Sequence, residues 1–243
     1  TSKDVKTELK SAGFGKELIL ANVRKMRKLV AGLSWGGEGS EWGGYEEFHN
    51  YSESDHALKE QFIEESVRDS GAKAVWDIGA NTGQFSRIAA QHADIVLAMD
   101  IDHFAVERMY RKNNEEGIGN ILPLVQNVCD PSPNWGWRNR ERSDLVTRAR
   151  PELVLCLALI HHVVITANVP LDEFIAWLAS VTDQLVIEYV SREDDKVKTL
   201  LRNKEDKYDD YRRDRLEAAL DRHFTIRNTP GLETGHRFLY WCG

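Results

Sequence analysis

The sequence predicts an α/β domain in which helices cover both faces of a seven-stranded, mostly parallel sheet. From residue 73 onward, short apolar runs rich in β-branched residues alternate with segments whose apolar residues recur at helical spacing. The last two apolar runs follow each other with only a Pro230-Gly231 turn signal between them. This spacing predicts an antiparallel hairpin at the C-terminal edge of the sheet.

The alternation places each element. Strands are expected at residues 74–78, 95–99, 121–125, 153–157, 185–189, 224–227 and 236–241. Helices are expected between them at 83–91, 103–114, 171–180, 192–201 and 208–222. Because parallel neighbours need a crossover connection, each of the early helices returns the chain so that the next strand starts at the same end of the sheet.

A helical extension is expected before this domain, with the boundary near residue 70. Apolar residues at helical spacing predict helices within 3–33 and over 54–70, where Ser54-Asp55 is an N-cap signal and Gly71 ends the helix. Residues 1–70 therefore form the extension and a lid, and residues 71–243 form the α/β domain.

The segment 35–51 connects the two predicted helices and is rich in glycine and aromatic residues. It lacks helical and strand periodicity, so it is expected to be a loop. Tyr45 and Tyr51 are candidates for a lid that closes over a site and excludes water. A structural role, in which the aromatic residues tie the extension to the domain, is an equally open interpretation.

Composition limits the function classes. No apolar run approaches the ~20 residues that cross a bilayer, and the three cysteines have no CxxC spacing. We therefore expect a cytoplasmic protein with no membrane partner, no disulfide framework and no metal site. The net charge of −7 argues against nucleic acid as a partner. A basic stripe at residues 24–28 is either a solvated helix face or a docking surface.

A glycine-rich turn and a distant acid predict a nucleoside site. The first strand ends in the run Asp77-Ile78-Gly79-Ala80-Asn81-Thr82-Gly83, and the second strand ends in Asp100, 21 residues after Gly79. Glycines let a ligand approach the backbone, and a carboxylate at that place accepts hydrogen bonds from ribose hydroxyls. Asn81 and Gln84 stand where a dinucleotide fingerprint needs glycine, and the chain has no GKS or GKT of a phosphate-binding loop.

These residues resemble the first motif, D-x-G-x-x-x-G, of the class I, Rossmann-like S-adenosylmethionine-dependent methyltransferases. The resemblance implies that Asp77 and the glycine turn hold the methionine part of the cofactor. It places Asp100 on the ribose, and it leaves the adenine contact open between Asn127 and Asp130. The implied cofactor-binding residues are Asp77, Gly79, Ala80, Asn81, Gly83, Asp100, Ile101, Asn127, Val128 and Leu157.

Longer segments extend the resemblance. The runs DIGANTGQFSRIA, NVCDPSPNWGWRNRER, LALIHH and IEYVSREDDKV are similar to bacterial nodulation-type methyltransferases over about residues 35–241. This similarity implies a methyltransferase, with S-adenosylhomocysteine as the product of the cofactor, but it does not name an acceptor.

His161 and His162 follow the fourth predicted strand, where side chains of this superfamily face the transferable methyl group. Histidine is suited to remove a proton from an acceptor near neutral pH. Because adjacent residues of an extended chain point to opposite sides, only one of the two is expected to face the substrate. The alternative is that both only shape the site.

Two further places are candidates for acceptor contacts. Trp135, Trp137 and Arg138 lie in the loop after the third strand and could clamp a planar or anionic substrate, or they could simply form a surface excursion. Glu188 ends the fifth strand, where an ion pair with Arg237 is the alternative to a substrate contact.

The sequence thus predicts methyl transfer to an oxygen, nitrogen or carbon of a small-molecule or carrier-bound acceptor. The open alternatives are an RNA or protein acceptor, and a cofactor-binding fold with other chemistry. The absence of an NPPY-type tetrapeptide after the fourth strand disfavours an amino-directed nucleic-acid methyltransferase.

Overall fold

The computed structural model describes residues 13, 15–33, 53–202, 204–205 and 207–243. The chain divides into two compact units, Thr1–Glu38 and Gly39–Gly243. The first contains helix α2 (Lys16–Ala31), which lies within the predicted N-terminal helical segment. The predicted lid residues Tyr45 and Tyr51 lie outside the described residues.

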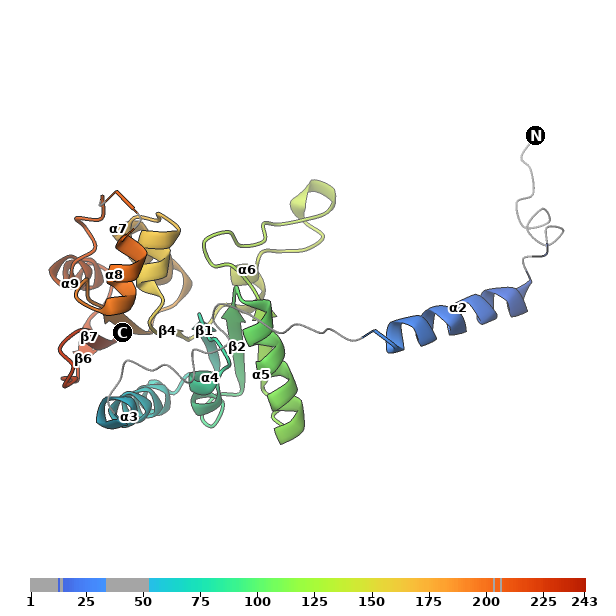
Figure 1. Cartoon of the computed structure of the whole chain (residues 1–243), viewed down its shortest axis with the longest axis horizontal. Helices are drawn as coiled ribbons and strands as arrows, with labels where there is room; N and C mark the ends of the chain where they lie inside the picture. Colours follow the sequence, from blue (N-terminus) through green and yellow to red (C-terminus); the bar gives the residue numbers. More distant parts are fainter. Residues whose placement is uncertain (1–12, 14, 34–52, 203, 206) are drawn as a thin grey trace. The chain divides into compact units, whose positions relative to one another are not determined.

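The second unit is built on one seven-stranded sheet, as the sequence predicts (Figure 1). Its strands are β1 (Ala74–Ile78), β2 (Ile95–Asp100), β3 (Ile121–Val125), β4 (Leu153–Cys156), β5 (Leu185–Val190), β6 (Ile226–Asn228) and β7 (Arg237–Cys242). The order across the sheet is β3-β2-β1-β4-β5-β7-β6. The first five strands are parallel, and β7 runs antiparallel to both β5 and β6. The predicted antiparallel edge hairpin is confirmed.

Helices cover both faces of this sheet. They are α3 (Glu53–Ser70), α4 (Gln84–Ala89), α5 (His103–Glu116), α6 (Leu145–Ala149), α7 (Leu171–Val181), α8 (Asp195–Leu201) and α9 (Arg213–Asp221). Two short turns of other helix types are η1 (Trp137–Asn139) and η2 (His162–Thr166). The turns η1 and η2 and the helix α6 have no counterpart in the sequence prediction, because each is too short to show a periodic apolar pattern.

Alternating residues of the strands form the two cores. Trp76 and Ile78 of β1 pack with residues of η2, α7, α8 and α9 on one face of the sheet. Val75 packs on the other face with Phe62 of α3 and Met109 of α5. Because successive side chains of a strand point to opposite faces, one short strand contributes residues to the cores on both faces of the sheet.

The division of the chain into two units falls at Glu38/Gly39, whereas the sequence-based boundary was expected at residue 70. Helix α3 belongs to the second unit, because its apolar residues Phe62, Ile63 and Val67 are buried in one of the two cores of the sheet. Asp55 also ties the start of α3 to the loop before β7, since its carboxylate accepts hydrogen bonds from the backbone N–H groups of Glu233 and Thr234.

Within the described ranges, no helix combines the length and the apolar character that crossing a bilayer requires.

Candidate functional site

The sheet reverses its strand order between β1 and β4, and in open α/β sheets such a reversal leaves a crevice at the carboxyl ends of the strands. A cavity of about 470 Å³ lies there, within the size range of small-molecule sites. Its wall consists of Gly79, Asn81, Asp100, Ile101, Gln126, Asn127, Val128, Cys129, Leu157, Ala158, Leu159, His162, Val163, Thr166 and Ala167.

The turn after β1 is pinned to the end of β2. The backbone N–H groups of Gly79 and Ala80 both donate to the carbonyl oxygen of Met99, at 2.8 and 2.9 Å. Gly79 has a φ of +77°, and a Cβ placed on it would lie 3.0 Å from a methyl carbon of Leu159. Only glycine therefore meets both the left-handed backbone and the close approach at this point of the wall.

Asp100 stands at the carboxyl end of β2 with both carboxylate oxygens held. One oxygen accepts the backbone N–H of Asn81 and the other accepts that of Asp102, each at 2.8 Å. Burial raises the pKa of Asp100, and these two backbone hydrogen bonds oppose that shift. Since a carboxylate offers about four acceptor positions, Asp100 retains acceptor capacity on a cavity wall.

Two predicted cofactor residues lie beneath the turn and do not line the cavity. The Asp77 carboxylate is buried and accepts a 2.5 Å hydrogen bond from Ser86 Oγ of α4, and burial raises its pKa to about 6. Gly83 has a φ of +83°, and a Cβ there would lie 2.8 Å from the Met109 side chain of α5. Both residues support the turn and its packing against the helices. Ala80 is also buried and is not part of the wall.

Further wall residues follow the ends of β2 and β3. Ile101 and Val128 supply apolar side chains to the wall. Asn127 also lines it, and its side-chain oxygen accepts the backbone N–H of Cys129 at 3.0 Å. Asp130, the alternative acid for this region, is not among the wall residues.

The two histidines occupy different environments. His162 lines the cavity, whereas His161 is 1% exposed, and neither ring nitrogen of His161 has a hydrogen-bond partner among the described residues. The centroids of the two imidazole rings are 4.2 Å apart. The extended-chain argument used for the sequence prediction is wrong, because the backbone at His161 is helical and η2 is a π-helix. Burial, with the charge of Lys196, lowers the pKa of His162 to about 4, so its ring is neutral at physiological pH.

Known proteins share sequence or fold with this chain. No family model matches the chain. Over 227 residues the chain is 31% identical to nodulation protein NoeA from Rhizobium meliloti (strain 1021), a match that covers 93% of the chain and 48% of NoeA. The chain thus spans about half the length of this curated relative.

Solved structures share the arrangement of strands and helices. The N-methyltransferase NodS from Bradyrhizobium japonicum WM9 matches with a TM-score of 0.56 and 11% identity, over 79% of this chain and 97% of NodS. Magnesium protoporphyrin IX methyltransferase (ChlM) from Synechocystis PCC 6803, with bound SAM, matches with a TM-score of 0.50 and 17% identity, over 85% of this chain and 86% of ChlM. The chain has the class I methyltransferase fold. The predicted resemblances to this fold and to nodulation proteins are confirmed.

Within this class I methyltransferase fold, the candidate acceptor residues do not gather at the cavity. Trp135 and Trp137 are 58% and 77% exposed in the loop between β3 and α6, and neither they nor Arg138 line the wall. A backbone pairing between Trp135 and Arg142 closes this loop, which projects from the sheet (Figure 1). The loop is thus a surface excursion, the alternative that the sequence left open, and its tryptophans point to solvent.

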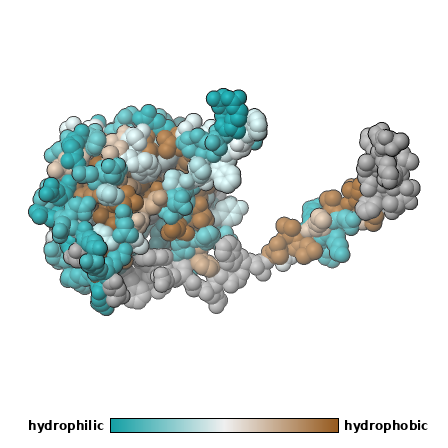
Figure 2. All heavy atoms as spheres, turned by 90° about the horizontal axis from the view of Figure 1, so that it is seen from above, coloured by the Kyte–Doolittle hydropathy of each residue, from teal (hydrophilic) through white to brown (hydrophobic). Residues whose placement is uncertain are grey.

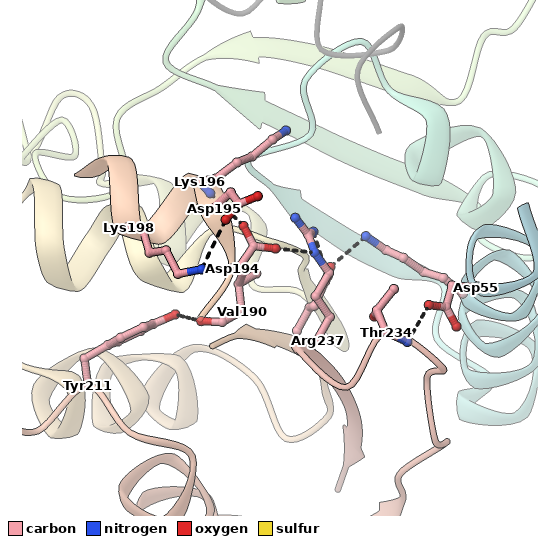
Figure 3. Close-up of polar contacts among 11 residues, drawn as sticks. Asp55, Val190, Asp194, Asp195, Lys196, Lys198, Tyr211, Thr234 and Arg237 are labelled. Atoms are coloured by element: carbon pink, nitrogen blue, oxygen red, sulfur yellow. Dashed lines mark hydrogen bonds and ion pairs between the residues drawn. The ribbon is translucent and has the colours of Figure 1, made fainter. Parts of the chain in front are cut away.

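Glu188 lies fully buried in a network of ion pairs. Its two carboxylate oxygens contact Lys59 Nζ of α3 at 2.7 Å and Arg237 Nη1 of β7 at 3.3 Å. Arg237 Nε also contacts Asp194 Oδ2, the N-cap of α8, at 3.1 Å (Figure 3). The ion-pair interpretation of Glu188 is therefore the one that matches the structure, and the network joins α3, β5, β7 and α8.

Several wall residues of this class I methyltransferase fold were not foreseen. Ala158, Val163, Thr166 and Ala167 enter the cavity because the chain turns sharply after β4 and forms η2. Ala158 has a φ of +49°, a conformation that residues with a side chain seldom adopt. A short π-helix after a strand leaves no periodic signal in the sequence, although π-helical turns are frequent at functional sites.

Proposed function

We propose that the chain binds S-adenosylmethionine in the cavity at the carboxyl ends of β1, β2 and β4, and that it transfers the methyl group to a small-molecule or carrier-bound acceptor. The observation that carries the proposal is the placement of Asp100 beside the glycine turn on one cavity wall. The 31% identity to NoeA and the fold shared with methyltransferases support it.

The wall fits the chemistry of this cofactor. Asp100 can accept hydrogen bonds from two ribose hydroxyls, and the side chains of Ile101 and Val128 suit a flat apolar base. Among the described wall residues, Asp100 is the one carboxylate, and none is lysine or arginine. A diphosphate group would find no cationic partner on this wall, whereas an adenosyl sulfonium, which is a cation, needs none.

Each residue then has a role in holding the cofactor, which supplies an activated methyl group when bound. The backbone of Gly79, Ala80 and Asn81 forms the turn beside its methionine part, and Asp100 orients the ribose. Asp77, through Ser86, keeps that turn against α4. Leu157 and Val163 exclude water from the same wall.

His162 is the candidate proton acceptor. It lies on the wall and its ring is neutral, but a pKa of about 4 makes it a weak base. It would therefore take the proton late in the transfer, when the incoming methyl group has made the acceptor strongly acidic. Collinear alignment of nucleophile, carbon and leaving group supplies most of the acceleration in such a displacement, so His162 adds to positioning rather than replacing it.

The fold leaves the acceptor atom open. NodS is named as an N-methyltransferase and ChlM as a methyltransferase of magnesium protoporphyrin IX, so one fold serves different acceptors. A small-molecule or carrier-bound acceptor remains our proposal because the chain has a net charge of −7, which disfavours attraction to nucleic acid.

The test is incubation of the protein with a cell extract and deuteriomethyl-labelled S-adenosylmethionine, followed by mass spectrometry of the small-molecule, protein and RNA fractions. The label is expected in the small-molecule fraction or on a carrier, and the Asp100→Ala variant should lose most of it. Label confined to RNA would overturn the proposed acceptor class. Tight cofactor binding with no label in any fraction would overturn the proposed activity.

A further inference from the structure

Helix α2 has an apolar face that is as long as the helix itself. Ile19, Val23, Met26 and Val30 recur at spacings of four, three and four residues, which places them in one stripe of the helix. Leu18 and Leu29 widen this stripe on one side by the same geometry. None of the residues of α2 is buried, and Figure 2 shows both brown apolar and teal polar surface along the helix.

The other face of α2 is strongly basic. The helix contains five basic residues and one acidic residue, Glu17, so it carries a net charge of +4. The basic residues are Lys16, Arg24, Lys25, Arg27 and Lys28. Because the whole chain has a net charge of −7, the residues outside α2 carry −11. The net charge of this helix is therefore opposite in sign to that of the rest of the chain.

The basic residues also border the apolar stripe. At 100° per residue, Lys16 and Arg27 fall along one edge of the stripe and Lys25 along the other, while Arg24 and Lys28 fall on the far side. Long basic side chains at such borders lay their methylene groups on apolar material and keep their charges at its polar surface. The helix thus has three zones: the apolar stripe, its basic borders and the basic far side. A partner surface with an apolar interior and an anionic outer layer matches all three.

Such a surface fits better than the other partners that a basic amphipathic helix could take. If a second copy of α2 packed on the apolar stripe, two helices that each carry a net charge of +4 would repel each other. Nucleic acid would pair with the charges but would leave the apolar stripe in water. A helix of 16 residues is about 24 Å long, too short and too charged to span a bilayer, but it can lie in its interface.

We propose that α2 is an interfacial anchor that lies in the surface of anionic phospholipid bilayers. Its apolar stripe enters the headgroup and acyl-chain boundary, and its basic residues contact the lipid phosphates and carboxylates. This inference is independent of the methyl-transfer proposal. It differs from the sequence-based expectation of no membrane partner, which considered only spanning segments.

The experiment is sedimentation of the full chain with vesicles of phosphatidylcholine alone and with vesicles of phosphatidylcholine and phosphatidylserine in a 3:1 ratio. The chain should bind the anionic vesicles at low salt and lose affinity as salt rises. Each basic residue near such a surface contributes roughly a fivefold factor in affinity. The combined variant Arg24→Gln, Lys25→Gln, Arg27→Gln and Lys28→Gln removes two charges at the border of the stripe and two on the far side. The two border charges alone should cost on the order of 25-fold in affinity.

Two further variants separate the zones of the helix. One variant combines Val23→Gln, Met26→Gln and Val30→Gln. It keeps the charge of the helix but removes the centre of the apolar stripe, so it should also abolish vesicle binding. The matched control Arg24→Lys, Lys25→Arg, Arg27→Lys and Lys28→Arg keeps every charge and should bind as the parent chain does. Thermal unfolding of each variant, followed by circular dichroism, should match the parent.

Four outcomes would overturn the inference. The first is no binding of the parent chain to anionic vesicles at low salt, and the second is equal binding to vesicles of both compositions. The third is self-association that the apolar variant abolishes, with no vesicle binding, which would assign α2 to a second copy. The fourth is salt-sensitive binding of a mixed-sequence RNA oligonucleotide with no vesicle binding, which would assign α2 to nucleic acid.

Discussion

Substitution of Asp100 by alanine should weaken cofactor binding without unfolding the domain. The structure gives Asp100 two separate tasks. Its oxygens accept the backbone N–H groups of Asn81 and Asp102, each at 2.8 Å, and in the proposed complex they also accept the ribose hydroxyls. Alanine removes both sets of hydrogen bonds.

The magnitude follows from the charge of the acceptor. Hydrogen bonds to charged groups contribute about 1.5–3 kcal/mol each, and the hydroxyls regain part of this from water once the carboxylate is gone. A net loss of about 1–3 kcal/mol corresponds to a rise in Kd of about 5- to 150-fold. Asp100→Asn keeps one acceptor oxygen, so its loss should fall between those of the parent and the alanine variant.

The assay is isothermal titration calorimetry with S-adenosylhomocysteine, and circular dichroism follows the folding of each variant. Asp130→Ala is the matched control, because Asp130 follows β3 at the same end of the sheet but is not part of the cavity wall. Its Kd should equal that of the parent. A folded Asp100→Ala variant that binds with the parent's Kd would refute the ribose role of Asp100.

Three further predictions concern the turn and the histidine. Gly83→Ala should lower the free energy of unfolding by about 1–3 kcal/mol in thermal unfolding, because its φ is +83° and the new Cβ would lie 2.8 Å from the Met109 side chain. The control Gly117→Ala has a φ of +69° but nothing near its Cβ, so it should lose less stability. Equal losses in the two variants would contradict the packing argument. The folded-state pKa of Asp77 is raised to about 6 from an ordinary 3.8, so its ionisation costs about 3 kcal/mol of stability at pH 7. This cost should disappear as the pH falls from about 6 to about 4, and denaturant unfolding of Asp77→Asn should lack this pH dependence. His162→Gln should reduce kcat with little change in the Kd of the cofactor. The acid limb of the parent's kcat–pH profile should lie near pH 4 rather than 6.5. Unchanged kcat in the variant would rule out a role of His162 as a base.

The fold could be predicted from the sequence because its strands are short, mostly apolar runs that alternate with helical segments. Each of the runs that became β1 and β3 has the bounds that were expected, since a short, mostly apolar run stands out between polar turns. The placement of Asp100 also followed, because the carboxyl ends of parallel neighbours meet at one edge of the sheet.

The cavity wall beyond Asp100 was predicted less well. Asp77 belongs to the recognised motif but points beneath the turn, to Ser86, and a motif shows which residues recur rather than which way they face. The turn at Ala158 and the π-helix after it depend on packing against the rest of the domain. Local sequence carries no information about such packing.

Buried charge was the other feature that the sequence indicated only in part. The Glu188–Arg237 pair was one of two interpretations, but Lys59, which completes it from α3, lies 129 residues away in the chain. Desolvation lowers the pKa of Lys59, and Glu188 opposes that shift. A partner from a helix assigned to another domain could not be inferred, because the predicted boundary at residue 70 separated the two.

The most direct test of the central claim is a crystal structure of the chain with S-adenosylhomocysteine. We expect both ribose hydroxyls within hydrogen-bond distance of the Asp100 carboxylate, and the adenine between Ile101 and Val128. A ligand bound elsewhere, or failure to bind together with clean occupancy of this cavity by NAD, would contradict the assignment of the cavity.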